Sequence, residues 1–180
     1  MMFLETCLQK FILLIYRMPT MYLPVYAVFA AMLYNSLYRK YAGERWLRIG
    51  TGGLLAGWFF AVLWTTIFSR ETGTYESCWI PLHAYWLLFS DGEPEMYRSC
   101  LMNVALFYPA GLLLAGLLPQ RGSYRGRMLC TAICFGLFSF PIELCQYFLQ
   151  LGIAEFDDVL HNTLGAVAGF TAFHLDASHR

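Results

Sequence analysis

The sequence predicts an all-α, polytopic membrane bundle of five transmembrane helices with an N-terminal amphipathic interfacial helix. Hydrophobic residues make up 58% of the 180 residues and charged residues only 13%, whereas an ordinary soluble domain has about 25% charged residues. Several apolar runs approach ~20 residues without a charge, the length at which a helix crosses a bilayer. These two observations favour a multi-span membrane protein over a very apolar soluble helical bundle.

The N-terminal region is predicted to be a helix that lies on the membrane surface. Over residues 3–17, apolar side chains recur three and four positions apart on one face, with Glu5, Gln9 and Lys10 on the other. This segment is too short to span the bilayer, which favours the interface, and it lacks a small-residue cleavage site. We therefore expect an interfacial helix at 1–18 and a transmembrane domain at 19–180.

Five apolar segments follow, each long enough for one crossing. In the second, Gly53 and Gly57 have the GxxxG spacing that permits close approach of another helix. In the third, Pro109 is expected to kink the helix. The five predicted spans are 20–38, 49–68, 96–118, 128–150 and 158–175.

The longest connection, residues 71–98, contains an aromatic stretch at 79–89 that is too short to cross and should lie in the interface. Pro94 suits the first turn of the next helix. The six cysteines include no CxxC pair, so a zinc site is not expected. Cys78 and Cys100 flank the connection, and a disulfide between them and two free thiols are the alternatives.

The basic residues predict the orientation. The loops at 39–48 and 120–127 hold seven of the twelve Lys and Arg residues, so the positive-inside rule places them in the cytoplasm. With five spans, the N-terminus is then outside and the C-terminus inside. The long connection and the turn at 151–157 face outward.

Glu143 is the main candidate functional residue. It lies about eight residues below the outer end of the fourth span, which at ~1.5 Å per residue is roughly 12 Å deep. A charge at mid-helix costs about 2.5–3.5 kcal/mol to insert, so this side chain must face the bundle interior or water. Ser139, Gln146 and Gln150 share its helix face at spacings of three and four.

Other polar residues fall in the same outer half of the membrane. Asp158 and Asn162 share a helix face with Gly165 and Gly169, and these glycines permit another helix to approach. The one-sided set predicts a ligand-binding pocket that opens outward. The alternatives are a hydrogen-bond network that only locks the helices and, for Asp157 and Asp158, a favourable position at the helix dipole. The candidate ligand-binding residues are Arg70, Asn103, Glu143, Gln146, Asp158 and Asn162.

The chemistry that these residues could perform is limited. The chain has no GxSxG, no HExxH and no phosphate-cradling glycine loop. If the protein is an enzyme, Glu143 would donate or accept a proton and Asp158 would orient it or bind an ion. No cofactor is predicted, although carboxylate and amide oxygens could hold Mg²⁺ or Ca²⁺. His83 and His161 are predicted to be hydrogen-bonding histidines. Zero net charge gives no case for nucleic-acid binding.

Three motifs follow in order and at fixed spacing: NVALFYPAG (103–111), IELCQ (142–146) and DDVLHNTLG (157–165). Together with Arg70 and IPL at 80–82, they resemble the VanZ-like family of small bacterial membrane proteins over roughly residues 48–171. Family members often carry a basic residue in the turn before the aspartates, where this chain has QLGIAEF with Glu155.

The resemblance implies a function at the outer face of the bacterial cytoplasmic membrane, because the founding family member is tied to low-level resistance to teicoplanin, a lipid-tailed glycopeptide. The first hypothesis is a non-enzymatic envelope protein that binds a lipid-linked or amphiphilic ligand. The second is a membrane-embedded hydrolase or transferase acting on an outer-leaflet lipid or cell-wall precursor. The third is a purely structural membrane subunit. The expected partner is a membrane lipid or lipid-linked precursor, and nothing in the sequence identifies a protein partner.

Overall fold

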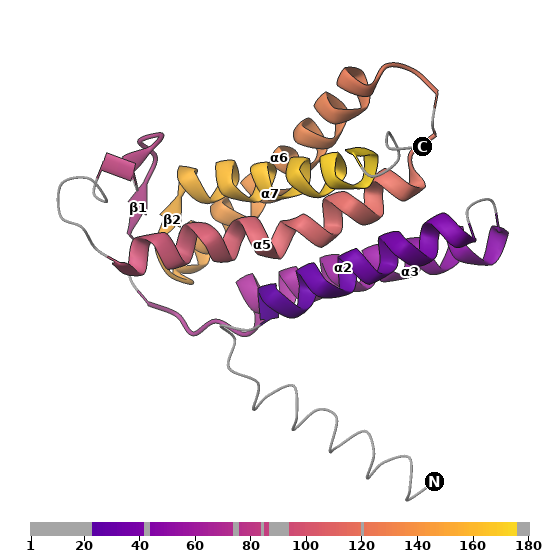
Figure 1. The fold of residues 1–180 in the computed structure, drawn as a ribbon. Coiled ribbons are helices and arrows are strands. Elements are labelled where there is room, and N and C mark those ends of the chain that lie inside the picture. Colours follow the sequence, from indigo (N-terminus) through magenta and orange to yellow (C-terminus); the bar gives the residue numbers. More distant parts are fainter. Residues whose placement is uncertain are drawn as a thin grey trace, which may run out of the picture.

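The computed structural model describes residues 23–41, 44–73, 76–83, 85–86, 94–119 and 121–175. These residues form a helical bundle with a small two-stranded sheet at one end (Figure 1). The interfacial helix predicted at 1–18 lies outside the described residues.

The helices lie close to the predicted spans. Pro94 opens its helix, as predicted, and the helices that contain Pro109 and Pro141 run through both prolines without a break. The elements are α2 (Leu23–Lys40), α3 (Arg45–Leu63) continued by the π-helix η2 (Trp64–Phe68), β1 (Ser77–Cys78), α5 (Pro94–Leu117), α6 (Tyr124–Leu149), β2 (Ala154–Glu155) and α7 (Phe156–Leu175).

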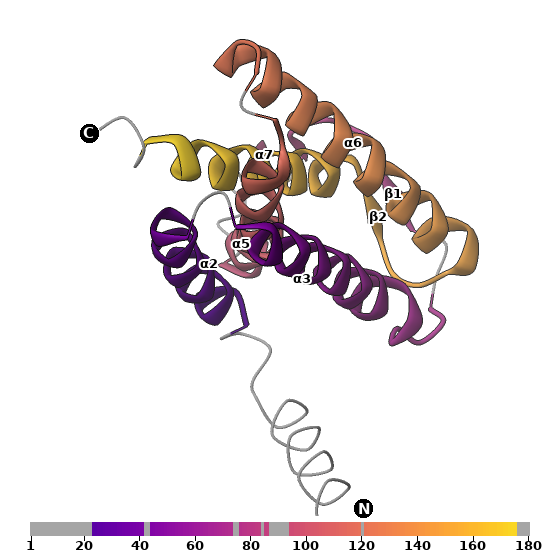
Figure 2. The same ribbon diagram turned by 90° about the vertical axis from the view of Figure 1, so that its right-hand side faces the viewer.

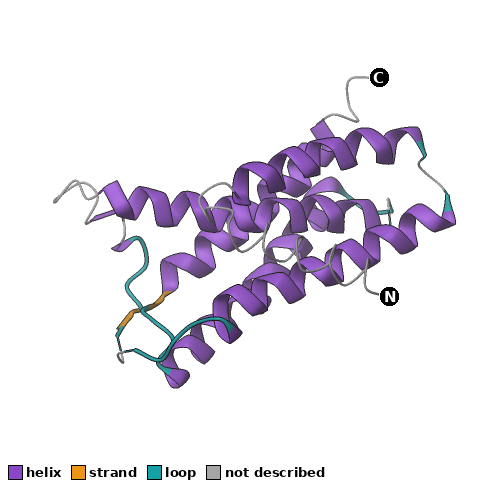
Figure 3. Cartoon of the chain, turned by 90° about the horizontal axis from the view of Figure 1, so that it is seen from below, coloured by secondary structure: helices purple, strands orange, loops and turns teal. Residues whose placement is uncertain are grey.

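Helix α5 runs through the middle of the bundle. It packs against α7 on one side and against α2 and α3 on the other (Figures 1 and 2). Helix α6 contacts α7 and leans away from the other helices toward its own N-terminus (Figure 2). Seen from below in Figure 3, the strands lie at one end of the bundle. The chain therefore brings the C-terminal ends of α3 and α6 and the N-terminal ends of α5 and α7 to the same end.

The contact between α5 and α7 is made by backbone against backbone. A Cβ added at Gly111 would lie 1.9 Å from the carbonyl oxygen of Ala166, and one added at Gly169 would lie 1.9 Å from that of Tyr108. Gly165 approaches the α5 backbone in the same way, at 2.2 Å. The close approach predicted for Gly165 and Gly169 is therefore confirmed, and α5 is the helix that makes it.

Gly53 and Gly57 behave differently. Both are exposed, and nothing in the described structure lies within 4 Å of a Cβ built on either one. The close helix approach that their spacing permits is not used within the described chain, because α3 turns another face inward. That face includes Thr51, Leu55 and Val62, which are buried.

The surface of the bundle exposes large apolar side chains, and its apolar core also contains buried polar ones. Phe29 and Leu137 are 74% and 70% exposed, whereas Thr131 and Ser139 are fully buried. Exposed apolar side chains together with buried polar ones suit hydrocarbon rather than water around the helices. By length and composition, the described helices that can cross a membrane are Arg45–Phe68, Ser99–Leu117 and Tyr124–Leu149. Helices α2 and α7 do not meet the same criterion, so five spans stay a prediction.

The cysteines at the strand end are free thiols. Cys78 lies in β1 and Cys100 in α5, and neither forms a disulfide. Of the two alternatives left open by the sequence, the structure therefore has the free thiols.

Candidate functional site

Four elements bring ionisable and amide side chains together at the strand end of the bundle. The Asn103 side chain on α5 hydrogen-bonds to the Asp158 carboxylate in the first turn of α7. Arg70, just beyond η2, interacts electrostatically with Asp158 and with Glu143 on α6. Glu155 of β2 also interacts with both of these carboxylates. We refer to Arg70, Asn103, Glu143, Glu155 and Asp158 as the polar cluster.

Glu143 faces the interior of the bundle, as the cost of exposing a charge to hydrocarbon requires. It is only 2% exposed, and its Oε2 accepts a hydrogen bond from the Glu155 backbone N–H at 3.1 Å. Arg70 supplies a compensating positive charge, while Asp158 is a like charge nearby. A hydrogen bond and a nearby opposite charge both reduce the cost of burying a carboxylate. Glu143 is therefore held by one backbone donor, and the positive charge of Arg70 partly offsets the cost of its burial.

Gln146 and Asn162 flank the polar cluster and join helices. Gln146 Nε2 donates to the Thr66 carbonyl oxygen at 3.1 Å, and Asn162 Nδ2 donates to Ser139 Oγ at 2.7 Å. Thr66 lies in η2, at the end of its helix, where carbonyls lack a donor within the helix. Gln146 and Asn162 thus each use an amide N–H to hydrogen-bond to another helix. Asn162 Oδ1 is buried and has no hydrogen-bond partner within the described structure.

A segment after α3 lies along the turn between α6 and α7. We call its described residues, 70–73, 76–83 and 85–86, the outer strap. Strands β1 and β2 pair in parallel, so residues 77–78 lie beside residues 154–155. Arg70 Nη1 also donates to the Leu151 carbonyl oxygen at 3.2 Å. The outer strap is therefore fixed by backbone groups of the turn that carries Glu155.

Two residues of α7 hold the far part of the outer strap. The Asp157 carboxylate accepts a hydrogen bond from the Leu82 backbone N–H, and the Tyr85 hydroxyl hydrogen-bonds to His161 Nε2 at 2.9 Å. Asp157 and His161 are both buried and lie one helical turn apart. Leu82 has a φ of +64°, in the left-handed region that non-glycine residues rarely adopt. His161 is a hydrogen-bonding histidine, as predicted.

Sequence reasoning missed two members of this arrangement. It paired Asp157 with His161 at a spacing of four, on a face separate from that of Asp158, but proposed only a dipole role for Asp157 and no contact with the outer strap. Sequence reasoning treated Glu155 only as the position where this chain lacks the basic residue of the family. In the structure, the Glu155 backbone N–H donates to the Glu143 carboxylate. Burial raises the pKa of the Glu155 carboxyl, the neighbouring Asp157 raises it further, and His83 opposes the shift.

The Glu143 carboxylate is covered, because the Glu155 backbone N–H of β2 donates to it and the side chain is only 2% exposed. Asn103, Glu155 and Asp158 are half-buried, and an outward-opening pocket stays a prediction. Arg70 is exposed and forms the outer margin of the polar cluster. Within the described residues, no group of three or more His, Cys, Asp or Glu side chains is arranged to hold a metal ion. Binding of Mg²⁺ or Ca²⁺ stays a prediction.

The apolar surface, the buried polar side chains and the three membrane-length helices define an α-helical membrane protein. The family model described as VanZ/LLP1 matches residues 51–176, most of the chain, and the chain belongs to this family. The match extends from α3 to α7, so it includes every residue of the polar cluster and confirms the resemblance seen in the sequence. Comparisons with curated proteins and with solved structures found no significant match.

Proposed function

We propose that this protein binds a lipid-linked or amphiphilic ligand at the outer face of the bacterial cytoplasmic membrane and alters susceptibility to teicoplanin-type glycopeptides. The observation that carries the proposal is the polar cluster, in which ionisable and amide side chains from four elements and from the segment after η2 meet at one end of a largely apolar bundle. Such residues are expensive within a membrane and generally mark a binding or transport site.

The proposed topology has five spans, with the N-terminus outside and the C-terminus inside. The α2–α3 and α5–α6 connections lie at the end of the bundle opposite the strands (Figure 1). Basic residues gather at these two connections: Lys40, Arg45, Arg48, Arg121, Arg125 and Arg127. The positive-inside rule favours a cytoplasmic location for them, which assigns the polar cluster to the outer side. Helices α2 and α7 complete the five spans in this proposal.

The residues at the margin suggest how a ligand reaches the polar cluster. Trp79 and Trp86 of the outer strap are exposed, and amphipathic rings of this kind favour the headgroup level of a bilayer. Arg70 is also exposed, and its guanidinium suits a phosphate or carboxylate of an amphiphile. Behind Arg70, the carboxylates of Glu143 and Asp158 would accept hydrogen bonds from donors on the ligand. In this proposal the outer strap moves aside to admit the ligand.

A catalytic role is the second candidate, favoured by the pairing of Glu143 with a second carboxylate, Asp158, beside a guanidinium. In that case Glu143 would serve as the acid or base in a hydrolase or transferase that acts on an outer-leaflet lipid or cell-wall precursor. Asp158 would orient it. The two candidates differ in how completely function depends on the ionisable carboxyl of Glu143.

The experiment is Glu143→Gln, which keeps an oxygen for the Glu155 N–H but removes the ionisable group. Teicoplanin susceptibility is measured in a sensitive host, together with the amount of protein in the membrane. Glu44→Gln is the matched control, because Glu44 is an exposed acid at the opposite end. Partial loss at a normal membrane level supports ligand binding, and complete loss supports catalysis. If Glu143→Gln retains full function, both candidates are wrong and the protein is a structural subunit.

A further inference from the structure

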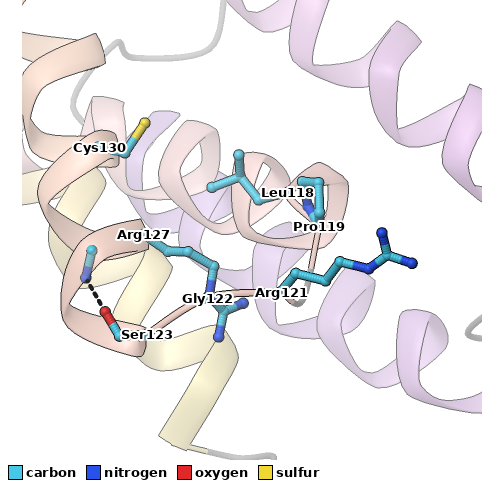
Figure 4. A pocket seen from close by; sticks show the side chains of 8 residues that line it. Leu118, Pro119, Arg121, Gly122, Ser123, Arg127 and Cys130 are labelled. Atoms are coloured by element: carbon cyan, nitrogen blue, oxygen red, sulfur yellow. Dashed lines mark hydrogen bonds between the residues drawn. The ribbon is translucent and has the colours of Figure 1, made fainter.

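A pocket of about 270 Å³ lies at the end of the bundle remote from the polar cluster, between the end of α5 and the first turns of α6 (Figure 4). It plays no part in the proposed function. Its lining includes Leu118, Pro119, Arg121, Ser123, Arg127 and Cys130.

The pocket is positively charged. Arg121 and Arg127 line it, and the lining contains no acid. Figure 4 shows the Arg127 guanidinium beside Gly122, with the Arg121 side chain extending from the same loop. The first turn of α6 contributes the positive end of its dipole as well. An anion is therefore the ligand that this charge favours.

The same pocket has an apolar wall that continues along α6. Leu118, Pro119 and Cys130 form the wall. Beyond it, Leu129, Ile133 and Leu137 are exposed at a spacing of four, and α6 leans away from the bundle there (Figure 2). No helix of the described chain covers this stripe. A ligand that fits both features has an anionic head and an apolar tail.

We propose that this pocket binds the phosphate group of an anionic phospholipid, with an acyl chain along the exposed stripe of α6. Guanidinium groups bind phosphate oxygens through paired, charge-assisted hydrogen bonds, for which the planar arginine side chain is well shaped. A soluble phosphate ester has the same head chemistry, but it would leave the apolar wall and stripe unused. The lipid is therefore the occupant that the structure favours.

The test measures lipid binding to the purified full-length protein in detergent, by native mass spectrometry and titration. The ligands are phosphatidylglycerol, phosphatidylcholine and inorganic phosphate. The wild type should prefer phosphatidylglycerol, and Arg121→Gln/Arg127→Gln should weaken its binding by about tenfold or more, the scale expected for two basic residues at an anionic membrane. Arg45→Gln/Arg48→Gln removes two exposed arginines at the same end, outside the pocket, and should leave binding unchanged.

Several results would overturn the proposal. If the Arg121/Arg127 variant binds phosphatidylglycerol as tightly as the wild type, these arginines do not hold the headgroup. If the Arg45/Arg48 variant loses as much binding as the pocket variant, the attraction is diffuse and there is no specific site. If the wild type binds phosphatidylcholine as well as phosphatidylglycerol, the anionic headgroup is not recognised. Full competition by inorganic phosphate identifies a soluble anion. If the double variant fails to fold, Arg121→Gln alone is the substitute, because Arg121 is exposed, and a measurable weakening of binding is still expected.

Discussion

Two glycine pairs with the same spacing have opposite surroundings. Gly165 and Gly169 on α7 meet the backbone of α5, whereas Gly53 and Gly57 on α3 meet nothing within 4 Å in the described structure. The α7 pair follows a run of buried polar side chains that bind other elements, beginning with Asp157. The α3 pair lies on an exposed apolar face. A small residue thus permits close approach, and the buried groups around it determine whether a partner helix is there.

The strongest test of this comparison is Gly169→Ala. The added methyl group would lie 1.9 Å from the Tyr108 carbonyl oxygen, and this neighbour is backbone that cannot rotate away. The α5–α7 contact must open, so we expect a loss of about 3 kcal/mol, the upper part of the range for overpacking. Fluorescence-detected size-exclusion chromatography after heating would show this as a large drop in melting temperature. An unchanged melting temperature would mean that α5 and α7 are further apart than described.

A second test removes the bond between α7 and the outer strap. Asp157→Ala leaves the Leu82 N–H without its acceptor, and a hydrogen bond to a carboxylate contributes about 1.5–3 kcal/mol. Hydrogen exchange should then rise in residues 76–86 while α5 stays protected. Glu71→Ala is the control, because Glu71 is an exposed acid at the start of the same segment. Equal exchange in both variants would show that Asp157 does not hold the outer strap.

A third test concerns the bond between α6 and α7. Ser139→Ala removes the acceptor of Asn162 Nδ2, and a bond of this kind between membrane helices contributes about 0.6–1.7 kcal/mol. We expect a modest fall in melting temperature with the fold retained. Ser69→Ala provides the comparison, because the Ser69 hydroxyl makes only a long, exposed bond of 3.4 Å within its own helix. A larger loss from Ser69→Ala than from Ser139→Ala would contradict the assignment.

The smallest effect, with the opposite sign, is expected from Gly53→Ala/Gly57→Ala. Both methyl groups have open space, and alanine favours a helix over glycine by up to about 1 kcal/mol in water. The melting temperature should stay the same or rise slightly. A clear fall in melting temperature would mean that another molecule packs on this face of α3. Both glycine pairs would then make close contacts, and they would differ only in whether the partner is a helix of the same chain or a separate molecule.

Much of the bundle could be predicted from hydropathy and a few local signals. The helix bounds lie within a few residues of the predicted spans, and Pro94 marks the start of α5. The inward position of Glu143 followed from the cost of a charge in hydrocarbon. These features depend on each segment by itself, which is why a single sequence is enough to find them.

The outer strap could not be predicted in the same way. Its strands have two residues each, too few for any alternation to show, and its register depends on backbone groups of a distant turn. Leucine is not a residue type that indicates a left-handed conformation, so the positive φ of Leu82 could not be predicted. The covering of Glu143 by β2 depends on the pairing of β2 with the outer strap, so it could not be predicted from local sequence. The ligand-binding roles of the six predicted residues stay predictions.

The long-range pairing of the outer strap also sets an order of events during synthesis. Leu82 and Tyr85 bind groups that lie 75 and 76 positions later in the chain. The ribosome must therefore deliver the last helical hairpin before this surface segment can adopt its final shape. Closure of so long a loop carries an entropic cost that the new bonds must offset. The cover over the carboxylates is accordingly a late product of biogenesis, completed only after the helices beneath it are in place.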